Sequence, residues 1–138
     1  MPFLVTVPLG AAFLISLLGR RDRAICGLLA NVGTFILIGL SSYALYMTTS
    51  HKALVFKVGN WMPPFGILLV IDSFSSLMLV LVNLIAFLVT IYSIDYIKIY
   101  TDEWKYYTLL MFMIGGVNGV LVSGDLFNMY VFLEITSI

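Results

Sequence analysis

Long apolar runs, separated by short polar breaks, dominate this chain of 138 residues. A helix that spans a membrane needs about 20 mainly apolar residues, with a range of about 17–25. Four runs reach that length, and a fifth begins near the end of the sequence. The predicted spans cover about residues 2–19, 24–49, 73–96, 106–123 and, incomplete, 126–138. We therefore expect an all-α integral membrane protein with a single membrane domain over residues 1–138.

The segment between the second and third spans has a different pattern. Two β-prone runs, which begin at Ala53 and end at Ile71, flank the turn-forming stretch Gly59-Asn60-Trp61-Met62-Pro63-Pro64. Such a pattern is typical of a β-hairpin, and the two prolines oppose one helix running through. The sequence predicts an external hairpin over about residues 53–71 on the membrane surface. An irregular loop is the alternative.

The composition indicates that lipid is the main solvent. Hydrophobic residues make up 62% of the chain and charged residues only 10%, whereas soluble domains are about a quarter charged. The formal net charge is zero and no basic stripe exists, so we expect no nucleic-acid partner. A single cysteine and a single histidine exclude an internal disulfide and a metal cluster of the His/Cys kind. No redox, nucleotide or haem motif is present, so we expect no cofactor and no catalysis by this chain alone.

Basic residues in short loops predict the orientation of the spans, because cytoplasmic loops carry an excess of Lys and Arg. The loops 20–23 and 97–105 share one side and hold Arg20, Arg21, Arg23, Lys98 and Lys105. The opposite side holds only Lys52 and Lys57. We expect a multi-pass protein of the cell membrane, with these two loops cytoplasmic and the N-terminus and hairpin outside.

Several polar residues near or within the spans have structural explanations. Asp72 and Asp125 precede predicted helices and fit N-caps, where a carboxylate accepts from free backbone N–H groups. Asn83 and Asn118 lie within spans, and we expect each to hydrogen-bond a neighbouring helix; the alternative is that they line a hydrated path. The four-residue spacing of Gly115, Gly119 and Ser123, with Gly116 beside them, predicts one helix face that another helix approaches closely.

Glu134 is the residue that these explanations do not cover. If the fifth helix starts at Leu126, Glu134 lies about 12 Å along it, close to the middle of a hydrocarbon layer about 30 Å thick. A carboxylate at that depth is kept mainly in a pathway, a relay or a buried pair. We predict that Glu134 is buried and handles protons; the alternative is a permanently protonated side chain that donates one interhelical hydrogen bond. Helical spacing makes Tyr130 and Ser137 candidate supporting residues, together with Asn118.

Three motifs carry a resemblance to a known family: Gly59-Asn60-Trp61-x-x-Pro64-Phe65-Gly66-Ile67, Asp72-Ser-Phe-Ser-Ser-Leu-Met78 and Gly124-Asp-Leu-Phe-Asn-Met-Tyr-Val-Phe-Leu-Glu134. They resemble the large antiporter-like subunits of Mrp-type cation/proton antiporters, most of all those of the D type. Close relatives occur in respiratory complex I and in membrane-bound hydrogenases and sulfur reductases. The resemblance implies an external hairpin and a glutamate on the fifth helix, which Glu134 matches. In the family this glutamate pairs with a lysine on the seventh helix. Switching of such ion pairs drives proton movement and, in some members, sodium exchange.

The sequence departs from that family pattern at its end. It stops four residues after Glu134, and it has no seventh helix, no lysine partner and no second repeat. We expect other membrane subunits of a large complex, one of which completes the fifth helix and supplies a lysine for Glu134, or else a sequence that is a fragment. The leading hypothesis is the N-terminal portion of a proton-translocating or sodium/proton-exchanging subunit. The alternatives are a structural subunit that scaffolds such a complex, and a stand-alone channel or lipid-binding protein.

Overall fold

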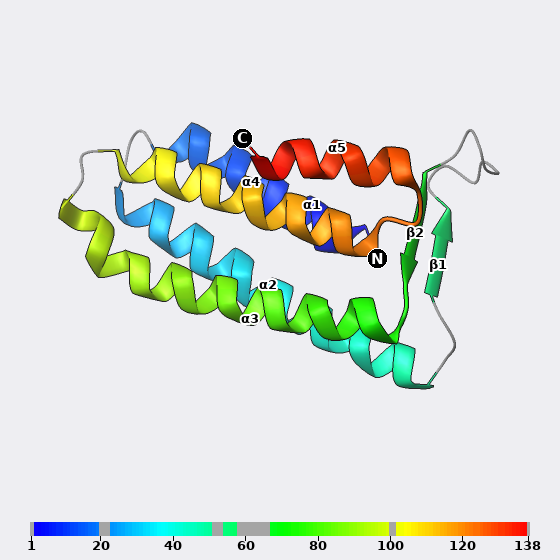
Figure 1. Cartoon of the computed structure of the whole chain (residues 1–138). Coiled ribbons are helices and arrows are strands. Elements are labelled where there is room, and N and C mark those ends of the chain that lie inside the picture. Colours follow the sequence, from blue (N-terminus) through cyan, green and yellow to red (C-terminus); the bar gives the residue numbers. More distant parts are fainter. Residues whose placement is uncertain (1, 20–22, 51–53, 58–66, 100–101, 138) are drawn as a thin grey trace.

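The structure, a computed structural model, describes residues 2–19, 23–50, 54–57, 67–99 and 102–137. These residues are mostly helical, and a small two-stranded sheet stands between the second and third helices (Figure 1). The helices are α1 (Phe3–Leu18), α2 (Arg23–Ser50), α3 (Ser73–Tyr96), α4 (Glu103–Val122) and α5 (Leu126–Ser137), with a short 3-10 turn, η2 (Ile97–Ile99), after α3.

Within the described residues, three helices are long and apolar enough to cross a membrane. They are Ile25–Ser50 of α2, all of α3 and all of α4. The helix α1 has 16 residues and α5 has 12, fewer than the roughly 20 residues of a typical span. The prediction of four full spans is therefore confirmed for three helices and not for α1, which is shorter than predicted because Pro2 and Gly19 stand outside it as its caps.

The helices run back and forth, so that their connections gather at two ends of the bundle (Figure 1). The sheet, the start of α1, the end of α2 and the turn between α4 and α5 lie at one end. The helix ends that flank the loops 20–23 and 97–105 lie at the other end. This grouping is the one that the orientation argument assumed. Which end faces the cytoplasm stays a prediction.

The predicted hairpin is present as two antiparallel strands, β1 (Leu54–Lys57) and β2 (Leu68–Ile71). Leu54 pairs with Ile71 and Lys57 with Leu68, while the connecting residues 58–66 lie outside the described part. Along β2 the buried positions alternate, as expected for a strand with one covered face. The backbone N–H of Gly124 donates to the carbonyl of Leu68 at 2.8 Å, so the turn between α4 and α5 rests on the free edge of β2.

The seam between α2 and α3 is built from small and polar residues. The buried positions of α3 are spaced alternately three and four residues apart: Ser76, Leu79, Asn83, Ala86, Thr90 and Ser93. Hydroxyl pairs cross the seam, from Thr48 to Ser76 at 2.9 Å and from Thr34 to Thr90 at 3.2 Å. In lipid, close packing of small residues and interhelical hydrogen bonds replace the hydrophobic effect as the force between helices. These pairs therefore fix the register of α2 against α3.

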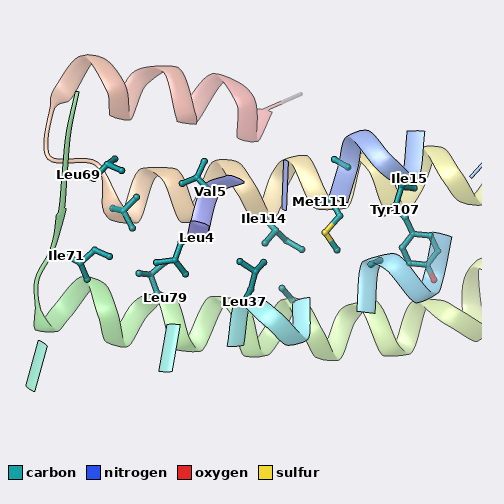
Figure 2. Close-up of a cluster of buried hydrophobic side chains, with 14 of the residues drawn as sticks. Leu4, Val5, Ile15, Leu37, Leu69, Ile71, Leu79, Tyr107, Met111 and Ile114 are labelled. Carbon is teal, nitrogen blue, oxygen red and sulfur yellow. The ribbon is translucent and has the colours of Figure 1, made fainter. Parts of the chain in front are cut away.

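The apolar core lies between α1, α2, α3 and α4, and β2 closes one end of it (Figure 2). Leu4, Leu37, Leu79 and Ile114 point toward one another from four different helices (Figure 2). Among the described residues, α5 contributes no member of this buried cluster, and only its Phe132 packs against the edge. The fifth helix is therefore an outer layer of the bundle, held mainly by α4.

Candidate functional site

The start of α5 is fixed by a cap and a tight turn. The side-chain Oδ1 of Asp125 accepts from the backbone N–H of Phe127 at 3.4 Å, and its carbonyl accepts from the N–H of Met129 at 3.0 Å. The hydroxyl of Ser123 donates to the same carbonyl at 2.9 Å. The Phe127 hydrogen bond is the one expected of an N-cap at Asp125. It sets where the helix that carries Glu134 begins.

Asp72 plays the same part for α3. Its Oδ1 accepts from the backbone N–H of Ser75 at 2.7 Å, which confirms the predicted cap. This hydrogen bond favours the ionised carboxylate and lowers the pKa of Asp72 below its usual value. Asp72 is exposed at the end of β2. It therefore defines the junction between the sheet and the third helix and takes no part in the α5 site.

The contact between α4 and α5 is close enough to exclude side chains at two positions of α4. A Cβ added at Gly116 would lie 2.9 Å from the backbone N of Thr136 and 3.0 Å from the carbonyl O of Phe132. A Cβ added at Gly119 would collide with the ring of Phe132. The hydroxyl of Thr136 donates to the carbonyl of Phe132 at 2.8 Å, so its polar atom is satisfied within α5. The short distances at Gly116 show that the backbones of α4 and α5 are in direct contact.

The small residues of α4 do not all serve this contact. A Cβ at Gly115 would meet Leu9 and Pro8 of α1, at 3.1 and 3.4 Å for the nearest atom of each. Gly115 and Gly119 are both closely approached, as predicted, but by two different helices, α1 and α5. At about 100° per residue, Gly119 lies between Gly115 and Gly116 around the helix. The small surface of α4 is broad enough to receive α1 on one edge and α5 on the other.

Glu134 lies on the side of α5 that faces away from α4. Phe132 and Thr136 touch α4, and Glu134 is two residues from each, about 200° around the helix. Its side chain is exposed in the structure, so the predicted burial is not found. The reason is the position of α5 at the edge of the bundle, where the described chain places no element over its outer face. Among the residues that the structure describes, none forms an ion pair or a side-chain hydrogen bond with the Glu134 carboxylate.

Two of the candidate supporting residues share the outer face of Glu134. Tyr130, one turn earlier, is 60% exposed. The hydroxyl of Ser137 donates to the backbone carbonyl of Glu134 at 2.9 Å and not to its carboxylate. Both residues thus lie on the face of α5 that helical spacing predicts. Neither of them bonds the acid in this structure.

Asn118, the third candidate, belongs to a different part of the molecule. Its Nδ2 donates to the carbonyl of Leu4 at 3.2 Å and to Oδ1 of Asn83 at 3.0 Å. Asn83 in turn donates to the carbonyl of Leu79 at 2.8 Å. The expected bonds to neighbouring helices are confirmed, and Asn118 is not brought to the face of Glu134. Its Oδ1 is buried without a protein partner among the described residues.

Known proteins are similar to this chain in both sequence and fold. Residues 56–108 match the family described as NADH-ubiquinone oxidoreductase (complex I), chain 5 N-terminus. The D-type subunit of a probable K(+)/H(+) antiporter from Rhizobium meliloti is 31% identical over 135 residues, which are 94% of this chain and 25% of that protein. A chain in the structure of the Mrp complex from a Dietzia species matches 98% of this chain and 25% of its own length, with a TM-score of 0.88 and 27% identity.

The chain is similar over nearly its whole length to a D-type antiporter subunit and to a chain of the Mrp complex. A second structure, of the membrane-bound sulfane sulfur reductase, an archaeal respiratory membrane complex, contains a chain with the same fold. The TM-score is 0.91 and the identity is 27%, and the match covers 97% of the present chain and 28% of the reductase chain. The present chain thus spans about a quarter of the length of the relatives that it matches. The resemblance that the sequence motifs indicated is confirmed.

Proposed function

We propose that this chain takes part in proton translocation, coupled to sodium or potassium exchange or to a redox reaction, within a multisubunit membrane complex. Its family supports the proposal, because one relative is named as part of a K(+)/H(+) antiporter and two structural neighbours belong to membrane complexes. In this proposal Glu134 is the group that takes up and releases the proton. The chain contributes no cofactor, and any electron transfer belongs to partner subunits.

The observation that carries the proposal is the position of Glu134 on the outer face of α5. It is the only acidic residue of that helix. Its neighbours on the exposed surface are the large apolar residues Phe127, Val131 and Leu133, together with Tyr130. An apolar face of this kind stays in lipid or is covered by another helix. An acid in the middle of it is costly unless it is paired or serves a pathway.

We propose that a further membrane helix covers this face and brings a lysine to Glu134. The pair would bury the carboxylate that the described chain leaves exposed. When the lysine moves away, the loss of its positive charge favours protonation of the acid, and its return favours release of the proton. A helix from another subunit, or from residues outside this sequence, fits this role equally.

The same proposal sets the chain in the membrane. We place α1 across the bilayer as a fourth span beside α2, α3 and α4, with which it shares the buried core, and α5 as the first part of a fifth span. The end with the hairpin faces outward from the cell membrane, and the end with the loops 20–23 and 97–105 faces the cytoplasm. The excess of basic residues in those loops supports this orientation.

The test is ion transport by membrane vesicles that carry the assembled complex with Glu134→Gln. Glutamine keeps the shape of the side chain and cannot ionise. We expect proton-coupled transport to fall by about a hundredfold, the lower end of what one positioned proton-transfer group contributes. Asp125→Asn is the matched control, because asparagine caps a helix as well as aspartate does and the substitution removes a carboxylate from the same segment. Transport should survive in this control.

Unchanged transport in Glu134→Gln would contradict the proton role. The alternative, a structural subunit that packs against proton-conducting subunits and scaffolds them, would then be favoured. In that case the described chain would matter through its packing alone, and loss of transport would follow only from variants that prevent assembly.

A further inference from the structure

The direct backbone contact between α4 and α5 is centred on Gly116. The nearest atoms to a Cβ at this position include the backbone N of Thr136 at 2.9 Å and the carbonyl O of Phe132 at 3.0 Å. Backbone atoms of a helix cannot rotate away as a side chain can. A methyl group at Gly116 can therefore be accommodated only if α5 itself moves.

Glu134 lies between the two α5 residues that form this contact. Phe132 precedes it by two positions and Thr136 follows it by two, and both face α4. The distance and rotation of α5 at Gly116 therefore determine where the Glu134 carboxylate stands on the opposite side of the helix. We propose that Gly116 is a positioning residue, which holds α5 at the distance and rotation that present Glu134 to its proton-exchange partner. This inference rests on the proposed function.

The other end of α5 is held separately, so a shift at Gly116 is not shared evenly along the helix. The N–H of Gly124 donates to Leu68 of β2 at 2.8 Å, and Asp125 caps the first turn of α5. With that end fixed, a methyl group at Gly116 tilts or rotates the far end of the helix. Glu134 is at the far end, so its carboxylate moves more than the residues near the cap.

The neighbouring glycines give a graded set of controls. At Gly119 the obstacle is the ring of Phe132, and at Gly115 it is the side chains of Leu9 and Pro8 on α1. A Cβ at Gly39 of α2 or at Gly10 of α1 would meet nothing within 4 Å. Each of these substitutions adds the same methyl group to a transmembrane segment. Among these positions, only Gly116 has backbone atoms of α5 among the three atoms nearest to the added Cβ.

Among the described residues, few titratable groups besides Glu134 lie near the contact. The titratable side chains of α4 are Glu103, Lys105, Tyr106 and Tyr107, all in its first five residues and so at the end of α4 far from Gly116. The strand β2 carries none. On α5 the titratable neighbour is Tyr130.

The experiment measures the pH dependence of ion transport by the assembled complex with Gly116→Ala. We expect the midpoint of the profile to move by roughly 1 pH unit, the low end of what a displaced neighbouring charge produces, and the maximal rate to fall severalfold. Gly39→Ala should keep the native profile. Gly115→Ala, which presses on α1, should keep the native midpoint even where it lowers the thermal stability of the complex.

A native midpoint and rate in Gly116→Ala would overturn the inference, and a midpoint shift of equal size in Gly115→Ala would do so too. If the complex with Gly116→Ala does not assemble, the inference is tested with Thr136→Ala. This substitution removes the α5 side chain that contacts Gly116. A midpoint displaced in the Thr136→Ala profile supports the inference, and a native profile overturns it. Failure of the proton role itself is distinguishable, since Glu134→Gln would then transport normally whatever Gly116 does.

Discussion

Asn118 of α4 donates a hydrogen bond of 3.0 Å from its Nδ2 to the Oδ1 of Asn83 on α3, and both side chains are fully buried. The same Nδ2 donates to the carbonyl of Leu4 on α1 at 3.2 Å. One amide group thus joins three helices in the middle of the bundle. Because hydrocarbon offers no replacement partner, a polar side chain at such a depth is kept where a neighbouring helix satisfies it. Asn118 therefore acts as an internal tie.

Replacement of Asn118 by leucine should lower the free energy of unfolding by about 1–2 kcal/mol, because it leaves the Asn83 side-chain oxygen and the Leu4 carbonyl without their donor. Denaturant unfolding of the purified protein in detergent measures this loss. The double variant Asn83→Leu/Asn118→Leu should be less destabilised than the sum of its single variants by about 0.6 kcal/mol, the mean for interhelical hydrogen bonds in membranes.

The control for that coupling pairs Asn118→Leu with Thr34→Val. The hydroxyl of Thr34 bonds Thr90 at another level of the bundle, so these two substitutions should be additive. Additive behaviour of Asn83→Leu and Asn118→Leu as well would show that the hydrogen bond between them contributes no stability.

The cap at Asp72 gives a prediction with a pH dependence. Alanine at this position should lower stability by about 1 kcal/mol or less, because it removes the acceptor for the Ser75 N–H from an N-cap that is open to water. Asparagine should retain most of the effect. Asp72 caps the first turn of helix α3, so thermal unfolding followed by circular dichroism reports the change.

The sign of the pH effect follows from the lowered pKa of the Asp72 carboxyl. The ionised form is favoured in the folded state, so its stabilisation is present at every pH above the unfolded-state pKa, which is about 3.9. That contribution is lost as the pH falls from there through the lower folded-state pKa. In Asp72→Asn this component of the acid sensitivity should be absent. An identical pH dependence in the native chain and in Asp72→Asn would rule out the charge contribution.

The local elements could be predicted from the sequence because each depends on nearby residues. The β-prone runs on either side of Pro63 and Pro64 predicted the two strands, and Asp72 and Asp125 marked the starts of α3 and α5. The interhelical role of Asn118 also followed, since a buried amide in lipid needs a partner. In these cases local physical chemistry leaves one favourable solution.

Other features depend on tertiary arrangement, which the local pattern does not contain. The division of the α4 surface between Gly115 and Gly116 depends on where α1 and α5 stand around that helix. The burial of Glu134 was predicted from its depth in a single helix, but burial also requires an element over the outer face of α5. Thr34 and Thr48 are two heptads apart, and so are their partners Thr90 and Ser76. This matching spacing was present in the sequence as a signal for the seam between α2 and α3.

Whether Glu134 changes its protonation state during transport can be observed by infrared difference spectroscopy of the assembled complex. Spectra are compared before and after transport is started, in the native complex, in Glu134→Gln and in Asp125→Asn. Proton handling by Glu134 predicts a carboxyl C=O band that appears or disappears in the native complex and in Asp125→Asn and is missing from Glu134→Gln. The same carboxyl band in all three spectra would contradict proton handling by Glu134.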